Sequence, residues 1–193
     1  MKRAVFLDRD GTLNRNIWNP VTGAYESPLY PEQMELVPGA ASALKLLRDA
    51  GFLLVLVSNQ PNAAKGKATA RALDAIHARF ECLLREEGIV LDAVYYCFHH
   101  PEFTGPCICR KPSPYFLFHM RDKSGVNLAE SWMIGDRITD VQCGLAAGVK
   151  TIFLSQSNPA ETSAGLAAPD IWVAAQMVVA HHAVRAMGFR VSI

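Results

Sequence analysis

The chain has 193 residues, of which 50% are hydrophobic and 19% charged, so it can bury a core and is not intrinsically disordered. Lysine plus arginine total 19 and aspartate plus glutamate total 18, and the formal net charge of +1 gives no indication of a nucleic-acid or membrane-surface binder. We therefore expect a single domain over residues 1–193, a monomer that acts without nucleic acid or membrane.

We expect no export signal at the N-terminus, because only the apolar residues 4–7 follow Lys2 and Arg3 before charged residues return. The most apolar late stretch, residues 171–187, contains polar and basic side chains and falls short of a membrane span. An odd number of cysteines, five, is a poor disulfide framework. Together these features favour a protein of the reducing cytoplasm.

Short apolar runs alternate with helical patterns along the chain, which predicts strands buried on both faces and joined by helices. In chain order we expect a strand at 4–7, a helix at 43–50, a strand at 53–57, a helix at 73–84, a strand at 93–96, a helix from Ser113 to Gly125, a strand at 132–134, a helix at 136–147, a strand at 151–154, a last strand at 170–173 and a helix at 174–187. This order predicts an α/β fold with an open, doubly wound, mostly parallel sheet, whose ligand site lies beyond the carboxyl ends of the strands.

Polar side chains follow several of these strands. Asp8 and Asp10 end the first strand and precede Gly11, which suits either an acidic turn or a cation site. Ser58, with two amides after it, ends the second strand, and taken alone it only begins a loop. Because these groups would meet at one edge of a parallel sheet, they are candidates for a common site.

Basic and acidic groups follow later in the chain. Arg110 and Lys111 precede a helix, and the alternative to a role in a site is a solvated basic turn. Asp136 and Asp140 lie in the first turn of another helix, where the alternative to a site role is favourable charge at the helix N-terminus. Carboxylates that hold a hard cation, with a lysine and a hydroxyl that hold phosphate oxygens, form a phosphoryl-transfer site. The set in chain order therefore predicts magnesium-dependent phosphoryl transfer.

These four motifs resemble those of the haloacid-dehalogenase-type (HAD) phosphatase superfamily. Its DxDxT motif corresponds to residues 8–12, its strand-terminal Ser or Thr to Ser58, its lysine to Lys111 and its GDxxxD motif to residues 135–140. A single motif is weak evidence, but four in order at strand ends are strong. The resemblance implies a HAD-like Rossmannoid fold, and since no long insertion follows the first or third predicted strand, we expect no large cap domain.

Three of the five cysteines lie in one loop. Cys97, His99, Cys107 and Cys109 supply three thiolates and one imidazole within thirteen residues, which favours a tetrahedral structural zinc site over free thiols. His100 is not expected to be a ligand, and the two other cysteines, Cys82 and Cys143, fall in helical patterns and are expected to be core thiols.

The loop at residues 97–109, which carries the four zinc-type ligands, resembles one branch of this superfamily in particular. The segments at 97–101 and 107–112 resemble those of the heptose 1,7-bisphosphate phosphatase branch of the superfamily, with histidinol-phosphate phosphatases as the alternative. Lys65-Gly66 also fits the heptose branch, whereas Pro61-Asn62 departs from the Ser-Gly that is usual there. The implied activity is hydrolysis of the C7 phosphate of a heptose bisphosphate; another small phosphomonoester stays open as the substrate.

The resemblance also implies the role of each site residue. Asp8 is the nucleophile that forms an aspartyl-phosphate, and Asp10 is the general acid and base. Asp8, Asp10 (through its backbone carbonyl) and Asp136 hold magnesium, Ser58 and Lys111 hold the phosphoryl oxygens, and Asp140 supports the site without binding metal. The residues expected to bind phosphate or substrate besides these are Asn59, Gln60, Arg110, Arg137, Asn16, Trp18 and Asn19.

Overall fold

The computed structural model describes residues 2–155 and 165–186 of the chain. Its centre is a six-stranded sheet in the order β5-β4-β1-β6-β7-β8, in which all neighbouring strands run parallel. The strands are β1 (Arg3–Leu7), β4 (Phe52–Asn59), β5 (Ala93–Cys97), β6 (Trp132–Gly135), β7 (Lys150–Leu154) and β8 (Leu166–Ala168). The five strands predicted up to residue 154 are all present in this sheet.

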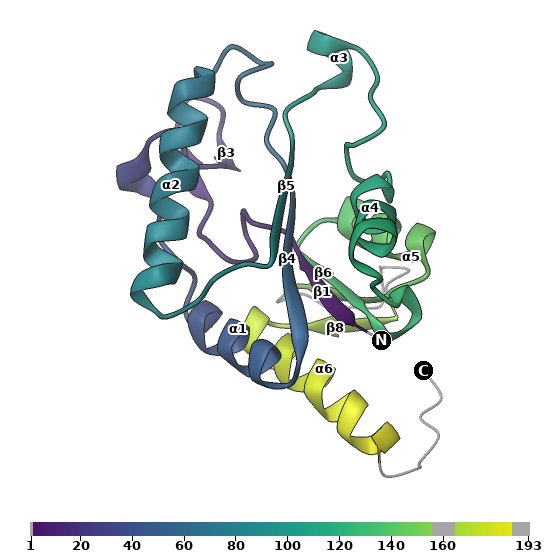
Figure 1. Cartoon of the computed structure of the whole chain (residues 1–193). Coiled ribbons are helices and arrows are strands. Elements are labelled where there is room, and N and C mark those ends of the chain that lie inside the picture. Colours follow the sequence, from purple (N-terminus) through teal and green to yellow (C-terminus); the bar gives the residue numbers. More distant parts are fainter. Residues whose placement is uncertain (1, 156–164, 187–193) are drawn as a thin grey trace.

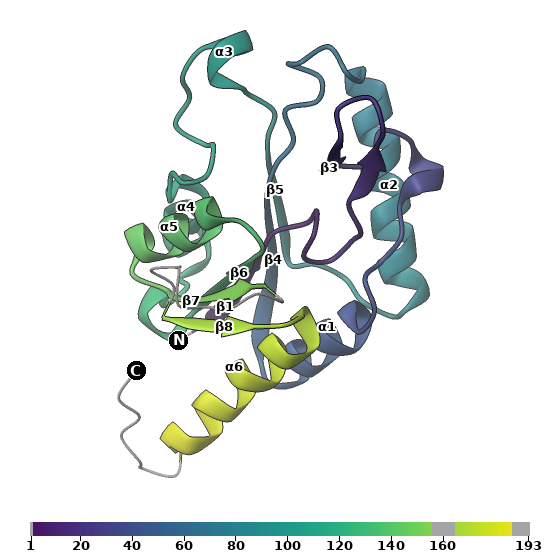
Figure 2. The same cartoon turned by 180° about the vertical axis from the view of Figure 1, so that it is seen from behind.

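Helices cover both faces of the sheet, as Figures 1 and 2 show. Alternate side chains of β1 enter opposite cores: Val5 and Leu7 pack in the larger core, and Ala4 and Phe6 in the smaller one. The larger core contains residues of α1 (Ala40–Asp49), α2 (Ala70–Glu86) and α6 (Ile171–Ala186), and the smaller core contains residues of α4 (Tyr115–Ser124) and α5 (Ile138–Ala147). The expected doubly wound α/β fold is therefore confirmed.

The strand predicted at residues 170–173 is wrong, because these residues open α6. The carboxylate of Asp170 accepts a hydrogen bond from the Val173 amide at 2.9 Å and caps this helix. Ile171, Ala174 and Val178 are buried at helical spacing, and β8 occupies the sheet edge instead. The helix predicted at 174–187 exists up to residue 186, and its last residue lies outside the described part of the chain.

Cys82 was expected in the core but is exposed. The buried stripe of α2 consists of Leu73, Ile76, Phe80 and Leu84, and Cys82 lies off this stripe. Cys143 is buried as expected and donates a hydrogen bond to the Ser113 carbonyl at 3.2 Å.

Besides β8, five short elements lie outside the predicted pattern. A hairpin of β2 (Ile17–Asn19) and β3 (Ala24–Glu26) follows β1, and the short helix α3 (Pro101–Thr104) lies in the cysteine loop. The other two are the 3₁₀ turns η1 (Pro31–Gln33) and η2 (Leu128–Glu130). In Figure 2, β3 and α3 both stand at the end of the molecule where β4 and β5 finish. The carboxyl edge of the sheet thus lies between two loop structures.

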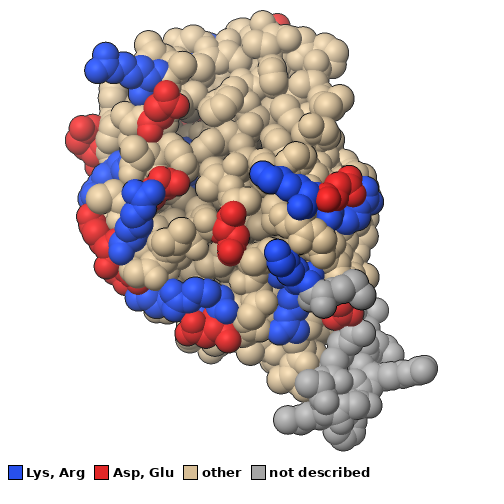
Figure 3. Space-filling view, in the orientation of Figure 1, with Lys and Arg blue, Asp and Glu red and all other residues tan. Residues whose placement is uncertain are grey.

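The surface does not show a large area of one charge on the face drawn in Figure 3, where basic and acidic side chains lie next to one another. Among the described helices, none combines the length and hydropathy that a bilayer crossing requires.

Candidate active site

A cavity of about 970 Å³ opens at the carboxyl edge of the sheet. β1 contributes Asp8 and Asp10 from the residues that follow it, β4 contributes Ser58, and the loop before α4 contributes Lys111. These strands meet at one edge because they are parallel, so residues that are about fifty or more positions apart come together. The four sequence motifs therefore lie in one place.

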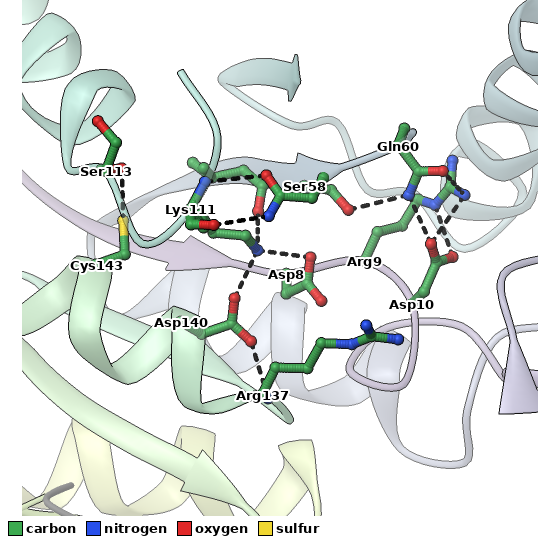
Figure 4. Close-up of polar contacts among 12 residues, drawn as sticks. Asp8, Arg9, Asp10, Ser58, Gln60, Lys111, Ser113, Arg137, Asp140 and Cys143 are labelled. Carbon is green, nitrogen blue, oxygen red and sulfur yellow. Dashed lines mark hydrogen bonds and ion pairs between the residues drawn. The ribbon is translucent and has the colours of Figure 1, made fainter. Parts of the chain in front are cut away.

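Lys111 is the centre of the buried charge network (Figure 4). Its ammonium group donates to Asp8 Oδ1 at 2.7 Å and to the Val57 carbonyl at 2.6 Å, and it pairs with Asp140 Oδ1 at 2.7 Å. Burial acts to lower the pKa of Lys111, but the carboxylates of Asp140 and Asp8 more than offset it and the pKa lies above its usual value. Lys111 is therefore a fixed positive charge beside Asp8.

Asp8, Asp136 and Asp140 form an acidic cluster whose carboxylate oxygens lie within 4.8 Å of one another. Asp136 Oδ1 is buried and has no hydrogen-bond partner among the described residues, whereas Asp140 is already paired with Lys111 and accepts from the Arg137 amide at 3.0 Å. Burial, with Asp8 and Asp140 nearby, raises the pKa of Asp136 to about 7. An unpartnered oxygen in an all-oxygen donor set fits a hard divalent cation such as magnesium.

The raised pKa of Asp136 predicts a pH-dependent affinity for magnesium. A proton on Asp136 competes with the cation, so affinity should rise by up to about tenfold per pH unit below pH 7 and level off above it. The same shift should make the metal-free protein less stable as the pH rises from about 4 to 7, since the folded state binds this proton more tightly than the unfolded state. Calorimetric titration with magnesium between pH 5.5 and 8.5 measures the affinity, and an Asp136→Asn variant should lack the slope. An affinity that is flat over this range would contradict the assignment.

Arg9 and Gln60 hold the carboxylate of Asp10 on the other side of the site (Figure 4). Arg9 donates to Oδ1 through Nε at 3.0 Å and to Oδ2 through Nη2 at 3.2 Å, while Gln60 Nε2 donates to Oδ2 at 2.6 Å. Burial acts to raise the pKa of Asp10, but Arg9 and these hydrogen bonds bring it below its ordinary value. Arg9 itself is 2% exposed. The sequence does not predict a site role for Arg9, because a charged residue between two aspartates usually faces solvent.

Two glycines allow this dense arrangement of acids. Gly11 has a φ of 85°, and a Cβ there would collide with the Asp136 carboxylate. A Cβ at Gly135 would collide with the Asp140 side chain. The glycines of the DxDxT and GDxxxD motifs are thus required by close packing of the acidic cluster.

The side chains that follow Ser58 are already bonded to protein. Ser58 Oγ accepts from Gln60 Nε2 at 3.1 Å, and Gln60 Oε1 accepts from Arg9 at 2.9 Å. The amide of Asn59 bonds to the backbone of Lys111. Of these residues, Ser58, Asn59 and Lys111 line the cavity.

The other predicted substrate residues divide into two groups. Arg110 and Arg137 line the cavity, together with Lys65, which lies outside the predicted set. Trp18 and Asn19 are not among the lining residues: Trp18 is 53% exposed and packs edge-on against Tyr25, which does line it. Asn19 donates to Glu26 at 3.2 Å in the hairpin, and Asn16 has a buried Oδ1 without a hydrogen-bond partner among the described residues.

The zinc-type cluster is formed as predicted by Cys97, His99, Cys107 and Cys109, whose ligand atoms lie within 4.8 Å of one another. The Sγ–Sγ distances are 3.1 to 3.7 Å, and His99 Nδ1 lies 3.4 Å from Cys109 Sγ. Such spacing leaves room for one ion with tetrahedral S₃N ligation, which zinc prefers. His100 does not join the cluster, because its Nδ1 accepts from the Glu102 amide and caps α3.

Removal of zinc is expected to loosen the loop from Cys97 to Cys109 while the sheet remains folded. The four ligands link the end of β5 to the segment before Lys111, beside a hydrogen bond that Arg110 Nη1 donates to the His99 carbonyl at 3.1 Å. Incubation with a strong chelator should therefore lower kcat and speed amide exchange in this loop, with little change in exchange at β1 and β4. A Cys82→Ser variant, which lacks an exposed thiol outside the cluster, is the control and should respond to the chelator as the wild type does. Full activity without zinc, measured with magnesium restored, would contradict this expectation.

Comparisons with known proteins agree with this site. A family model described as HAD-hydrolase-like matches residues 108–178. The D-glycero-beta-D-manno-heptose-1,7-bisphosphate 7-phosphatase of Yersinia pestis is 36% identical over 175 residues, covering 88% of this chain and 88% of that protein. The enzyme of the same name from Escherichia coli K12 is also 36% identical, over 88% of this chain and 87% of its own length.

The solved structures show the same relationship. The D,D-heptose 1,7-bisphosphate phosphatase of B. bronchiseptica, complexed with magnesium and phosphate, superposes with a TM-score of 0.78 at 27% identity over 94% of this chain and 99% of that chain. A HAD-like phosphatase from Mesorhizobium loti has a TM-score of 0.75 at 28% identity, over 92% of this chain and 86% of its own. The protein is thus a HAD-type phosphatase, and it belongs to the family of the heptose-1,7-bisphosphate 7-phosphatases.

Proposed function

We propose that this phosphatase hydrolyses the C7 phosphate of D-glycero-D-manno-heptose 1,7-bisphosphate with magnesium. The single observation that carries the proposal is the Asp8–Lys111–Asp140 network at the floor of the cavity, beside the unpartnered Asp136 carboxylate. Relatives at 36% identity that cover 88% of the chain carry this activity in their names. The preference for C7 over C1 is taken from those relatives.

Asp8 is the nucleophile in the proposed reaction. Lys111 Nζ lies 2.7 Å from its Oδ1 and holds this side chain in place, and the same ammonium group would neutralise charge on the transferring phosphoryl oxygens. Ser58 Oγ lies at the same edge and can donate to another of these oxygens. Magnesium, held by Asp8, Asp136 and the backbone carbonyl of Asp10, would supply charge neutralisation for the incoming phosphate.

Asp10 protonates the departing sugar oxygen and later takes a proton from the attacking water. Its hydrogen bonds from Arg9 and Gln60 favour the ionised form, which suits the second role. For the first role, the negative phosphate that enters the site raises the pKa of Asp10 by repulsion between like charges. The direct hydrogen bonds from Arg9 and Gln60 hold the carboxylate in place for both roles.

Cations at the cavity wall suit a substrate with a second phosphate. Arg110, Arg137 and Lys65 line the cavity at positions other than Lys111, and the described residues contain no carboxylate within ion-pair distance of these three side chains. A volume of about 970 Å³ is ample for a seven-carbon sugar with two phosphates. These three cations thus supply positive charge that suits binding of the phosphate that is not cleaved.

All of the proposed catalytic and metal-binding groups come from one chain, and we therefore propose that the enzyme works as a monomer on a free sugar phosphate. The zinc-type cluster needs reduced thiols, since thiolates and not disulfides ligate zinc. This favours a reducing cytoplasm as the place of action.

The proposal is tested by comparing kcat/KM for the heptose bisphosphate with kcat/KM for histidinol phosphate, each with magnesium. We expect the heptose bisphosphate to be preferred by at least about 100-fold, roughly the effect of one lost charged contact. Equal or reversed preference would overturn the substrate assignment while leaving the phosphatase chemistry intact.

A further inference from the structure

Asn59 directly follows the serine of the second motif, and its side-chain amide is occupied by protein. Its Oδ1 accepts a hydrogen bond from the Lys111 amide at 3.0 Å, and its Nδ2 donates to the Lys111 carbonyl at 3.1 Å. An asparagine side chain thus pairs with both backbone groups of one residue, as a neighbouring strand would. That residue carries the buried ammonium group next to Asp8.

The same part of β4 also holds the other end of the zinc-type loop. Asn59 is the register partner of Cys97, and the Gln60 amide donates to the Cys97 carbonyl at 2.7 Å. Residues 59 and 60 therefore fasten both the beginning of the loop, at Cys97, and its end, at Lys111. Cys109, two residues before Lys111, returns to Cys97 with an Sγ–Sγ distance of 3.1 Å.

We propose that Asn59 is a positioning residue for Lys111 and not a substrate contact. Its two hydrogen bonds fix the backbone from which the Lys111 side chain reaches Asp8 and Asp140, and they connect the metal-clamped loop to the sheet at the catalytic edge. A shift of about 1 Å in a catalytic group can lower the rate about 100-fold, so this restraint has a measurable effect. The inference rests on the proposed role of Lys111 in phosphoryl transfer.

Replacement of Asn59 with alanine should lower kcat about 10- to 100-fold and change KM by less than about threefold. Asn59→Asp keeps an acceptor for the Lys111 amide but loses the donor to its carbonyl, so its kcat should fall between those of Asn59→Ala and the wild type. The Lys111 amide should also exchange with solvent faster in Asn59→Ala, because its acceptor is gone. A tenfold rise of KM with unchanged kcat would identify a substrate contact and overturn the proposal.

A double-mutant cycle with Lys111→Met separates positioning from direct binding. If Asn59 acts through Lys111, then Asn59→Ala should change the residual rate of the Lys111→Met enzyme by less than about twofold. If that rate is too low to measure, the cycle is read from calorimetric binding of inorganic phosphate in the presence of magnesium, where the same non-additivity is expected. Equal losses in both backgrounds would overturn the proposal.

Asn127→Ala is the matched control. Asn127 also uses its side chain on backbone, accepting from the Ala129 amide at 3.1 Å, but it lies at η2, away from the cavity. Asn127→Ala should lower the thermal midpoint, by less than Asn59→Ala because one hydrogen bond is lost instead of two, while leaving kcat unchanged. If Asn59→Ala does not fold, the kcat and KM of Asn59→Asp decide the question. A wild-type protein without phosphatase activity would refute the proposed function, whereas an active wild type with an unimpaired Asn59→Ala would refute this inference alone.

Discussion

Replacing Asp8 with asparagine is expected to lower kcat by roughly 10⁴-fold or more, because the amide cannot attack phosphorus. The fold should survive, since an amide oxygen at this position can still accept the hydrogen bond that Lys111 donates at 2.7 Å. The substitution also removes one of three acids, two buried and one half-buried, that lie within 4.8 Å of one another. Steady-state kinetics with a phosphosugar and magnesium, together with the thermal midpoint, measure the two effects.

Asp49→Asn is the control for this experiment. Asp49 ends α1 and forms an exposed pair with Arg48, so its loss should change neither kcat nor the thermal midpoint appreciably. An Asp8→Asn enzyme that retains wild-type turnover would refute the nucleophile assignment. One that loses activity only because it unfolds would show a large fall in midpoint, which the structure does not predict.

Replacing Lys111 with methionine is expected to lower both activity and stability. The loss of the charged group that we propose holds the phosphoryl oxygens should reduce kcat about 10²- to 10³-fold. The variant also leaves Asp8 and Asp140 buried without their counter-ion, which costs about 3–5 kcal/mol at neutral pH. Denaturant unfolding without added magnesium measures the stability, so that magnesium does not compensate and zinc is not stripped from the cysteine cluster.

The stability loss of Lys111→Met is expected to increase with pH. Burial raises the pKa of Asp140 to about 6 even with Lys111 present, and removal of the lysine raises it further. The deficit of Lys111→Met should therefore be largest above pH 7 and shrink as the pH falls and the acids become neutral. Lys45→Met, which breaks the exposed pair with Glu87, should cost less than about 1 kcal/mol at any pH. Similar losses for both lysine variants would contradict the account of Lys111.

The sheet and the position of the site could be predicted because short apolar runs in a βα order have few alternatives. Parallel strands bring their carboxyl ends to one edge, so Asp8, Ser58 and Asp136 could be expected to lie near one another before any coordinates. The cysteine loop was equally open to prediction, because four soft ligands within thirteen residues have little other use.

Other features depend on tertiary contacts that no local pattern reports. The buried position of Arg9 follows from its bonds to Asp10 and Gln60, and the latter residue is fifty-one positions away. The segment at 170–173 has strand-like composition, yet a cap from Asp170 and packing of Ile171 against the core make it helical. The hairpin after β1 is too short and too exposed to leave a clear alternation.

The central claim is phosphoryl transfer from a heptose bisphosphate with a fixed choice between its two phosphates, and phosphorus-31 NMR tests it most directly. The purified enzyme is given D-glycero-D-manno-heptose 1,7-bisphosphate with magnesium, and the two phosphate resonances are followed with time. We expect the C7 resonance to disappear as inorganic phosphate grows in and the C1 resonance to persist, and we expect Asp8→Asn to leave both unchanged. Release of the C1 phosphate, or no release by the wild-type enzyme, would contradict the central claim.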